Sequence, residues 1–82
     1  MIPRVIDARY EHDYVIHLRF EDGTEGDVDL KEELYGEVFL KLLDIEYFKR
    51  FEVHPELHTL TWPNGADFAP EFLYEKTKVK AP

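Results

Sequence analysis

The sequence predicts a small α+β protein that forms a single domain, and three observations support this prediction. Apolar and polar residues alternate over residues 13–20 and in the segments on either side, which is typical of half-buried β-strands. Short helical patterns and a second pair of strand segments follow. The 82 residues are enough for one hydrophobic core but not for two. We expect an antiparallel three-stranded meander and a second short hairpin, covered by two or three short helices.

The central strand of the predicted sheet has the clearest alternation. Ile16, Leu18 and Phe20 point to one side of the strand, whereas His17 and Arg19 point to the other. The strands before and after it alternate in the same way and are expected to turn these side chains toward the core: Ile6, Ala8 and Tyr10 in the first strand, and Thr24, Gly26, Val28 and Leu30 in the third.

The loop lengths determine which residues face each other across the sheet. A two-residue Asp-Gly turn between the central and third strands would place carboxylates on the core face, which disfavours it. A three-residue loop at residues 21–23, with its glycine in the left-handed conformation, instead pairs Leu18 with Gly26 and Ile16 with Val28.

By the same reasoning, the first hairpin has its loop at residues 11–13. This loop pairs Tyr10 with Tyr14 and Ala8 with Ile16.

Short helical segments are expected to cover the sheet. The Asp-x-x-Glu pattern that begins at Asp29 predicts a helix over residues 30–35 that stops at the following glycine. A second helical stretch begins near Val38 and restarts at Asp44, which is placed to cap a helix over residues 45–50.

The second half of the chain contains a further hairpin and a last helix. Residues 51–53 and 59–62 are predicted to form two short strands, because a proline and polar residues lie between them. Pro70 suits the first position of a helix that ends near residue 76. The single domain is therefore expected to span residues 1–76, and residues 77–82 a basic C-terminal tail.

The composition excludes several classes of function. Eighteen acidic and ten basic residues give a net charge of −8, which opposes direct binding to nucleic acid and to anionic membranes. The chain has no cysteine, and hence no disulfide, thiolate nucleophile or cysteine-based zinc site. No apolar run approaches the ~20 residues that span a bilayer. We expect a cytoplasmic protein that contacts neither membranes nor nucleic acid directly.

No catalytic set is recognisable in the sequence. Serine is absent, the four glycines are too far apart for a phosphate-binding loop, and eighteen acids make any chosen carboxylate pair nonspecific. We therefore predict no catalytic residue and no cofactor, and favour a protein that is not an enzyme.

Two groups of residues are candidates for binding a small ligand or a metal. The predicted registers place Asp7 and Asp27 beside His17 on the polar face of the sheet, where the carboxylates would favour the protonated imidazole. The alternative is a solvated pattern of cross-strand charges. His54 and His58 have a four-residue spacing that brings two ligands together on a helix, but the proline between them favours a loop.

The segment Trp-Pro-Asn-Gly-Ala-Asp-Phe at residues 62–68 is the most distinctive part of the chain. An Asn-Gly pair permits the positive φ of a tight turn, and a helix start follows. One interpretation is architectural: Trp62 packs under the last helix, and Asp67 accepts hydrogen bonds from amides near its start. The other is a recognition surface in which Trp62, Asn64 and Asp67 contact a partner.

This motif resembles a family of short bacterial proteins known as domain-of-unknown-function family 2442. Further matching residues are the start Pro-Arg-Val-Ile, the strand end Phe-Glu-Asp-Gly, the pair Val-Phe at residues 38–39, and Pro-Glu and Leu-Tyr within residues 70–74. The resemblance extends from about Pro3 to Tyr74. It implies a small α+β domain with no established enzyme activity.

The resemblance also implies a function class. Some longer relatives carry a helix-turn-helix domain after this one, and genes of this type often sit beside others suspected of toxin–antitoxin or related regulatory roles. A noncatalytic protein-interaction or regulatory module of the bacterial cytoplasm is the leading hypothesis, with an unidentified protein partner. The alternative is a small-ligand or metal-binding domain. Unpaired strand edges leave a homo-oligomer open.

Overall fold

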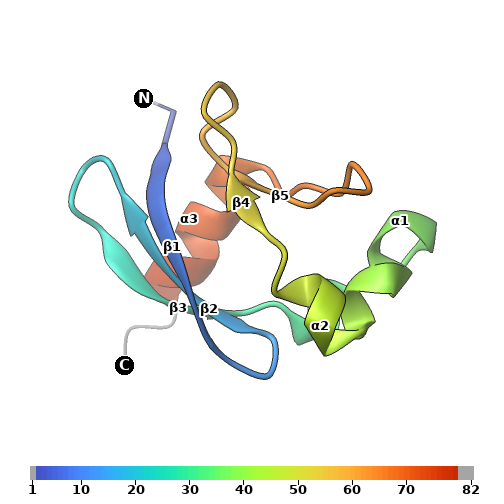
Figure 1. Cartoon of the computed structure of the whole chain (residues 1–82). Coiled ribbons are helices and arrows are strands. Elements are labelled where there is room, and N and C mark those ends of the chain that lie inside the picture. The colour runs from blue at the N-terminus through green and yellow to red at the C-terminus, as the bar shows by residue number, and fades with distance from the viewer. Residues whose placement is uncertain (1, 80–82) are drawn as a thin grey trace.

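A computed structural model describes residues 2–79, in which a three-stranded sheet and a separate hairpin are covered by short helices (Figure 1). The predicted α+β class is confirmed, with its antiparallel meander, second hairpin and short helices. The strands are β1 (Val5–His12), β2 (Val15–Phe20), β3 (Glu25–Asp29), β4 (Glu52–Val53) and β5 (Leu60–Thr61). The α-helices are α1 (Glu37–Leu40), α2 (Ile45–Phe48) and α3 (Pro70–Val79), and the 3-10 turns are η1 (Lys31–Glu33) and η2 (Lys41–Leu43).

The register between β2 and β3 is the predicted one. Leu18 lies opposite Gly26 and Ile16 opposite Val28. Gly23 has a φ of 93°, the left-handed conformation that the three-residue loop requires. The prediction of a bulged loop at residues 21–23 is therefore confirmed.

The predicted register of the first hairpin is wrong. Ala8 lies opposite Leu18 rather than Ile16, and Tyr10 lies opposite Ile16. The strand continues past the expected loop because an irregularity follows Tyr10 and because Asp13 adopts a φ of 45° in the tight turn. The new register is displaced by two positions, which leaves Ala8 and Tyr10 on their expected face. The apolar pattern could not distinguish the two pairings.

A second irregularity, near the start of β1, reverses the expected direction of Ile6. The regular pairing shifts between Val5 and Asp7, so Val5 is buried opposite Phe20 whereas Ile6 is 48% exposed. The backbone amide of Val5 donates to the carbonyl of His58 over 2.9 Å, which attaches β1 to the second hairpin.

The helical segments between β3 and β4 are shorter than predicted. The segment expected over residues 30–35 forms only the turn η1, where the carboxylate of Asp29 accepts a hydrogen bond from the amide of Lys31 over 3.0 Å. Asp44 caps α2 as predicted, because its carboxylate accepts from the amide of Glu46 over 3.1 Å. Helical segments this short are stable here because they pack on the core rather than stand alone.

The helix α3 continues beyond residue 76, where the sequence pattern ended it. The predicted basic tail at residues 77–82 therefore starts inside the helix, while its last three residues lie outside the described part of the chain. Thr77 is buried, and its hydroxyl donates to the carbonyl of Leu73 over 2.8 Å. A Cβ at Gly26 would lie 3.2 Å from the methyl group of Thr77, so this glycine allows α3 to approach β3 closely.

One hydrophobic core lies between the sheet, the short helices and α3. It is built from large apolar side chains that are almost fully buried: Phe20, Phe48, Ile16, Leu18, Leu30, Leu42, Leu60, Leu73, Val5 and Val28. The opposite face of the sheet remains polar. Within residues 2–79, none of the helices has the length and apolar character that crossing a membrane requires.

Candidate functional site

The segment at residues 62–68 forms a joint between the second hairpin and α3. The amide of Gly65 donates to the carbonyl of Trp62 over 3.0 Å, and the amide of Trp62 donates to the carbonyl of Ala66 over 2.9 Å. Gly65 has a φ of 91°, which a residue with a side chain rarely adopts. Asp67 then forms a backbone bridge with Thr61. The chain is thus folded back on β5 before α3 begins.

Trp62 lies in the core and not on a recognition surface. It is only 4% exposed, and its ring packs against Phe48, Phe51 and Phe68. Its indole nitrogen donates to the carbonyl of Phe48 over 2.9 Å. This hydrogen bond satisfies the one polar atom of the indole and fixes the joint to the end of α2. The burial of Trp62 supports the architectural interpretation, although the aromatic contacts of its ring are with Phe48, Phe51 and Phe68 rather than with the last helix.

Asn64 attaches α1 to the joint. Its side-chain amide donates to the carbonyl of Val38 over 2.9 Å, while its side-chain oxygen accepts from the amide of Ala66 over 3.0 Å. Both ends of the side chain are occupied by backbone groups of the same molecule. Asn64 thus holds the two segments that border the groove described next.

Asp67 behaves differently from the other two motif residues. Its side chain is exposed, and within residues 2–79 its carboxylate has no hydrogen bond and no basic group at ion-pair distance. The expected hydrogen bonds to amides at the start of the last helix are not formed. Asp67 is instead one of the residues that line an open groove.

This groove, which we call the α1–α3 groove, lies between α1, the joint and the first turn of α3. Its volume is about 330 Å³, and it is lined by Glu33, Tyr35, Phe39, Asp67, Phe68, Ala69 and Phe72. Three of the lining rings form a continuous stack. The ring centroids of Phe39 and Phe68 are 4.9 Å apart, and those of Phe68 and Phe72 are 5.6 Å apart, with interplanar angles of 26° and 17°.

The surface beside the groove is also apolar. Tyr35, Val38 and Leu40 are 71%, 44% and 55% exposed, and all three lie in the segment that forms one wall. In Figure 1 this wall, which carries α1, projects at one edge of the molecule. The sequence pattern did not reveal this site, because its walls come from three segments that meet only in the folded chain.

A lysine contacts two of the residues that line the groove. The ammonium group of Lys76 lies 3.4 Å from the carboxylate of Glu33 and 5.8 Å from the ring centroid of Phe72. Of the two acidic residues that line the groove, Glu33 is therefore neutralised within the molecule and Asp67 is not.

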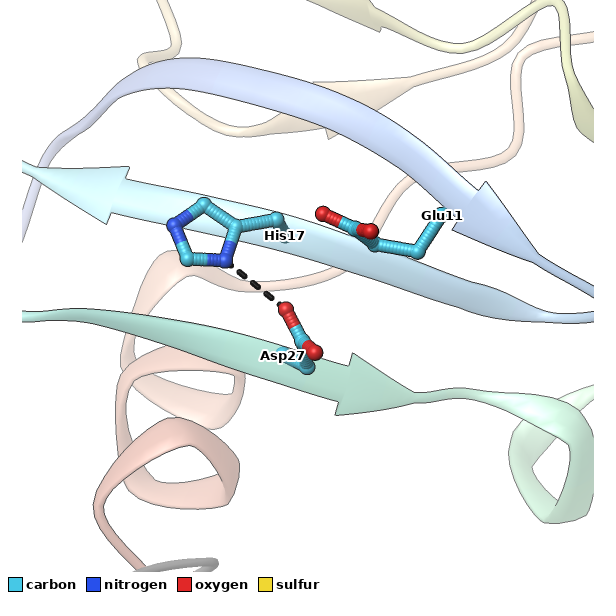
Figure 2. A group of neighbouring side chains, drawn as sticks. All are labelled: Glu11, His17 and Asp27. Carbon is cyan, nitrogen blue, oxygen red and sulfur yellow. Dashed lines mark hydrogen bonds and ion pairs between the residues drawn. The ribbon is translucent and has the colours of Figure 1, made fainter.

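A second cluster of ionisable groups lies on the polar face of the sheet (Figure 2). Nδ1 of His17 lies 2.7 Å from a carboxylate oxygen of Asp27, and Nε2 lies 2.8 Å from a carboxylate oxygen of Glu25. Both ring nitrogens can donate only when the imidazole is protonated. Hydrogen bonds to Glu25 and to Asp27 raise the pKa of His17 above its ordinary value of 6.5, against a lowering by burial.

The membership of this cluster differs from the prediction. Asp27 lies beside His17 as expected, but the corrected register places Asp7 opposite Arg19, so its proximity to His17 was wrongly predicted. Glu11, which follows Arg9 by two residues in β1, takes its place in the cluster (Figure 2).

Glu11, His17 and Asp27 offer a set of ligand atoms that lie within 4.8 Å of one another. Imidazole and carboxylate groups together suit divalent transition metals such as zinc. A cation bound there would have to replace the proton on His17, and Arg9, whose guanidinium lies 3.0 Å from Glu11, adds opposing charge.

His54 and His58 do not form a pair of ligands. Nδ1 of His54 accepts hydrogen bonds from the amides of Glu56 and Leu57, each over 3.1 Å, so this nitrogen holds the loop. His58 has a φ of 55° at the end of the loop. The prediction that the proline between them produces a loop is confirmed, and within residues 2–79 neither histidine belongs to a group of three ligands.

The contacts of His17 predict a specific pH dependence of stability. Because its folded pKa is raised, its pairs with Glu25 and Asp27 stabilise the fold fully below pH 6.5, and this contribution is lost as the pH rises through the folded pKa. Each pair is expected to contribute about 0.2–1 kcal/mol. Urea unfolding of the wild type and His17→Gln, between about pH 5.5 and 9, should show a difference that shrinks as the pH rises.

An NMR titration of the His17 ring provides the independent check. A midpoint at or below 6.5, or an unfolding difference that does not change with pH, would contradict the charged interpretation of the cluster.

Comparison with known proteins gives one match. A protein family described as "Protein of unknown function (DUF2442)" matches residues 5–79. No curated protein and no solved structure matches the chain.

Proposed function

The chain belongs to the family described as "Protein of unknown function (DUF2442)", and we propose that it acts as a noncatalytic protein-interaction or regulatory module. Its contact surface is the α1–α3 groove together with the exposed side chains of Tyr35, Val38 and Leu40. The partner is another protein that covers this surface.

The observation that carries the proposal is the stack of aromatic rings open to the surface in the groove. Phe39 and Phe72 are only half-buried, although both pack on the core. Exposed apolar surface is unfavourable in water by about 25 cal/mol per Å², and large exposed apolar patches mark interaction sites. A partner that fills the groove would gain this free energy. Aromatic side chains in a pocket also form the centres of many protein interfaces.

The charges in the groove favour binding over catalysis. Its ionisable side chains are Glu33, Asp67 and the phenol of Tyr35. Glu33 is paired with Lys76, and Asp67 has no basic group at ion-pair distance among the described residues. A nucleophile beside a base, the arrangement that activates it, is not part of the groove lining.

A photo-crosslinking experiment tests the proposal. A benzophenone amino acid replaces Tyr35 in the full chain, expressed in its native host, and a control chain carries it in place of Arg19 on the polar face of the sheet. We expect position 35 to give a discrete adduct with another protein that position 19 does not give. Leu40→Lys, which places a charge on the exposed apolar surface, should weaken that adduct.

Two results of the crosslinking would count against a partner at the groove. One is the absence of an adduct from position 35, and the other is the same set of adducts from both positions. An adduct with twice the mass of the chain would identify the partner as a second copy.

A second candidate function is the binding of a divalent transition-metal cation by Glu11, His17 and Asp27. The observation that favours it is the proximity of their ligand atoms, all within 4.8 Å. Titration with zinc should shift the NMR signals of the His17 ring in the wild type, and backbone signals of β1 to β3 should stay unmoved in His17→Gln. An unmoved His17 ring would exclude this function.

A further inference from the structure

We propose that the α1–α3 groove binds an arginine side chain presented by the partner protein. This inference rests on the proposed function, because it names the chemistry by which the partner is recognised. It is carried by three features of the groove: the stacked rings, the free carboxylate of Asp67, and the lysine that already contacts two of its lining residues.

The two outer rings of the stack, Phe39 and Phe72, provide aromatic surface for a planar cation, whereas Phe68 is buried. Phe39, Phe68 and Phe72 lie nearly parallel, at 26° and 17°, and Phe39 and Phe72 keep part of their surface exposed to the groove. A guanidinium group stacks on such faces by cation–π and planar contacts, whereas its three methylene groups pack on apolar surface. A purely aliphatic side chain would use only the second of these contacts.

Asp67 provides the matching charge. Asp67 is one of the residues that line the groove, its side chain is exposed, and its carboxylate has no basic partner at ion-pair distance within residues 2–79. An arginine whose stem lies on the rings can bring its guanidinium to this carboxylate, and such pairs are often bidentate. The net charge of −8 would also attract a basic segment at long range.

Lys76 shows how a basic side chain contacts residues of the groove lining. Its ammonium group uses the same two kinds of contact, a carboxylate of Glu33 at 3.4 Å and the ring of Phe72 at 5.8 Å. The groove lining contains one further carboxylate, that of Asp67, and one further half-buried ring, that of Phe39. No basic residue of the described chain lies at ion-pair distance from Asp67, so its carboxylate is available to a partner.

An NMR titration of the full chain tests the inference. The probes are N-acetyl-arginine methylamide and N-acetyl-citrulline methylamide, which have similar shapes but differ in charge. We expect the arginine probe to shift signals of Tyr35, Ala69 and Phe72 and to saturate with a Kd of about 1–10 mM, as befits so small a ligand. The citrulline probe should bind about three- to tenfold more weakly, and so should the arginine probe to Asp67→Asn.

Three results would overturn the inference. They are equal affinities for the two probes, unchanged affinity in Asp67→Asn, and shifts absent at concentrations up to about 20 mM, which corresponds to a binding free energy weaker than about −2.3 kcal/mol. If position 35 still captures a protein while the arginine probe fails, the proposed function stands and the arginine recognition is wrong. If the probe binds but no protein is captured, the proposed function fails and the cation site stands.

Discussion

Trp62→Ala is expected to lower the free energy of unfolding by about 3–5 kcal/mol, the usual cost of removing a buried large aromatic side chain. Three rings, those of Phe48, Phe51 and Phe68, would lose their contact with the indole. The carbonyl of Phe48 would also lose the hydrogen bond from the indole nitrogen. A chain of this length has a total stability of about 4–12 kcal/mol, so a large part of it depends on this one side chain.

Thermal unfolding measures this effect. A loss of 3 kcal/mol corresponds to a decrease in Tm of about 12 °C or more for a domain of this size. Trp62→Phe separates the hydrogen bond from the packing and should cost about 1–3 kcal/mol, because it leaves a buried carbonyl without its donor. The control is Tyr35→Ala, which should change stability by about 0.5 kcal/mol or less, since Tyr35 is 71% exposed. Equal costs for Trp62→Ala and Tyr35→Ala would contradict the architectural role of Trp62.

Asp67→Lys is expected to weaken binding of the arginine probe by at least about tenfold without lowering the stability of the fold. The substitution replaces an attractive charge on a groove-lining residue by a repulsive one. Because the wild-type carboxylate is exposed and has no hydrogen bond within the described residues, its removal leaves no buried group unsatisfied.

The matched control for this substitution is Asp7→Lys. Asp7 lies on the polar face of the sheet opposite Arg19, and its replacement changes the net charge by the same amount. The two variants should have similar Tm values, while only Asp67→Lys loses affinity for the probe. A similar loss in both would show that the net charge, and not the groove, determines binding.

The register between β2 and β3 was predictable because only one loop length keeps carboxylates away from the core. Leu18 opposite Gly26 follows from that condition alone. The first hairpin offered no such test. Its two registers differ by an even number of positions, so both place Tyr10 and Ala8 on the same face, and only the left-handed Asp13 in the tight turn shows which one forms.

The candidate site was predictable only in part. The motif identified the joint, and its aspartate does border the groove, but the pattern could not show that Trp62 is buried and that Asn64 is occupied by backbone groups. Phe39 and Phe72 are far apart in the sequence, and each is typical of an ordinary core position. Their contact with Phe68 depends on how α1 and α3 pack, which local patterns do not encode.

The most direct test of a contact surface at the α1–α3 groove is the yield of the Tyr35 crosslink in the two charge-reversed variants. We predict that Asp67→Lys reduces the yield of the protein adduct several-fold, whereas Asp7→Lys leaves it at the wild-type level. A yield that is unchanged in Asp67→Lys, or that falls in Asp7→Lys instead, would contradict recognition through the groove and would direct attention to the polar face of the sheet.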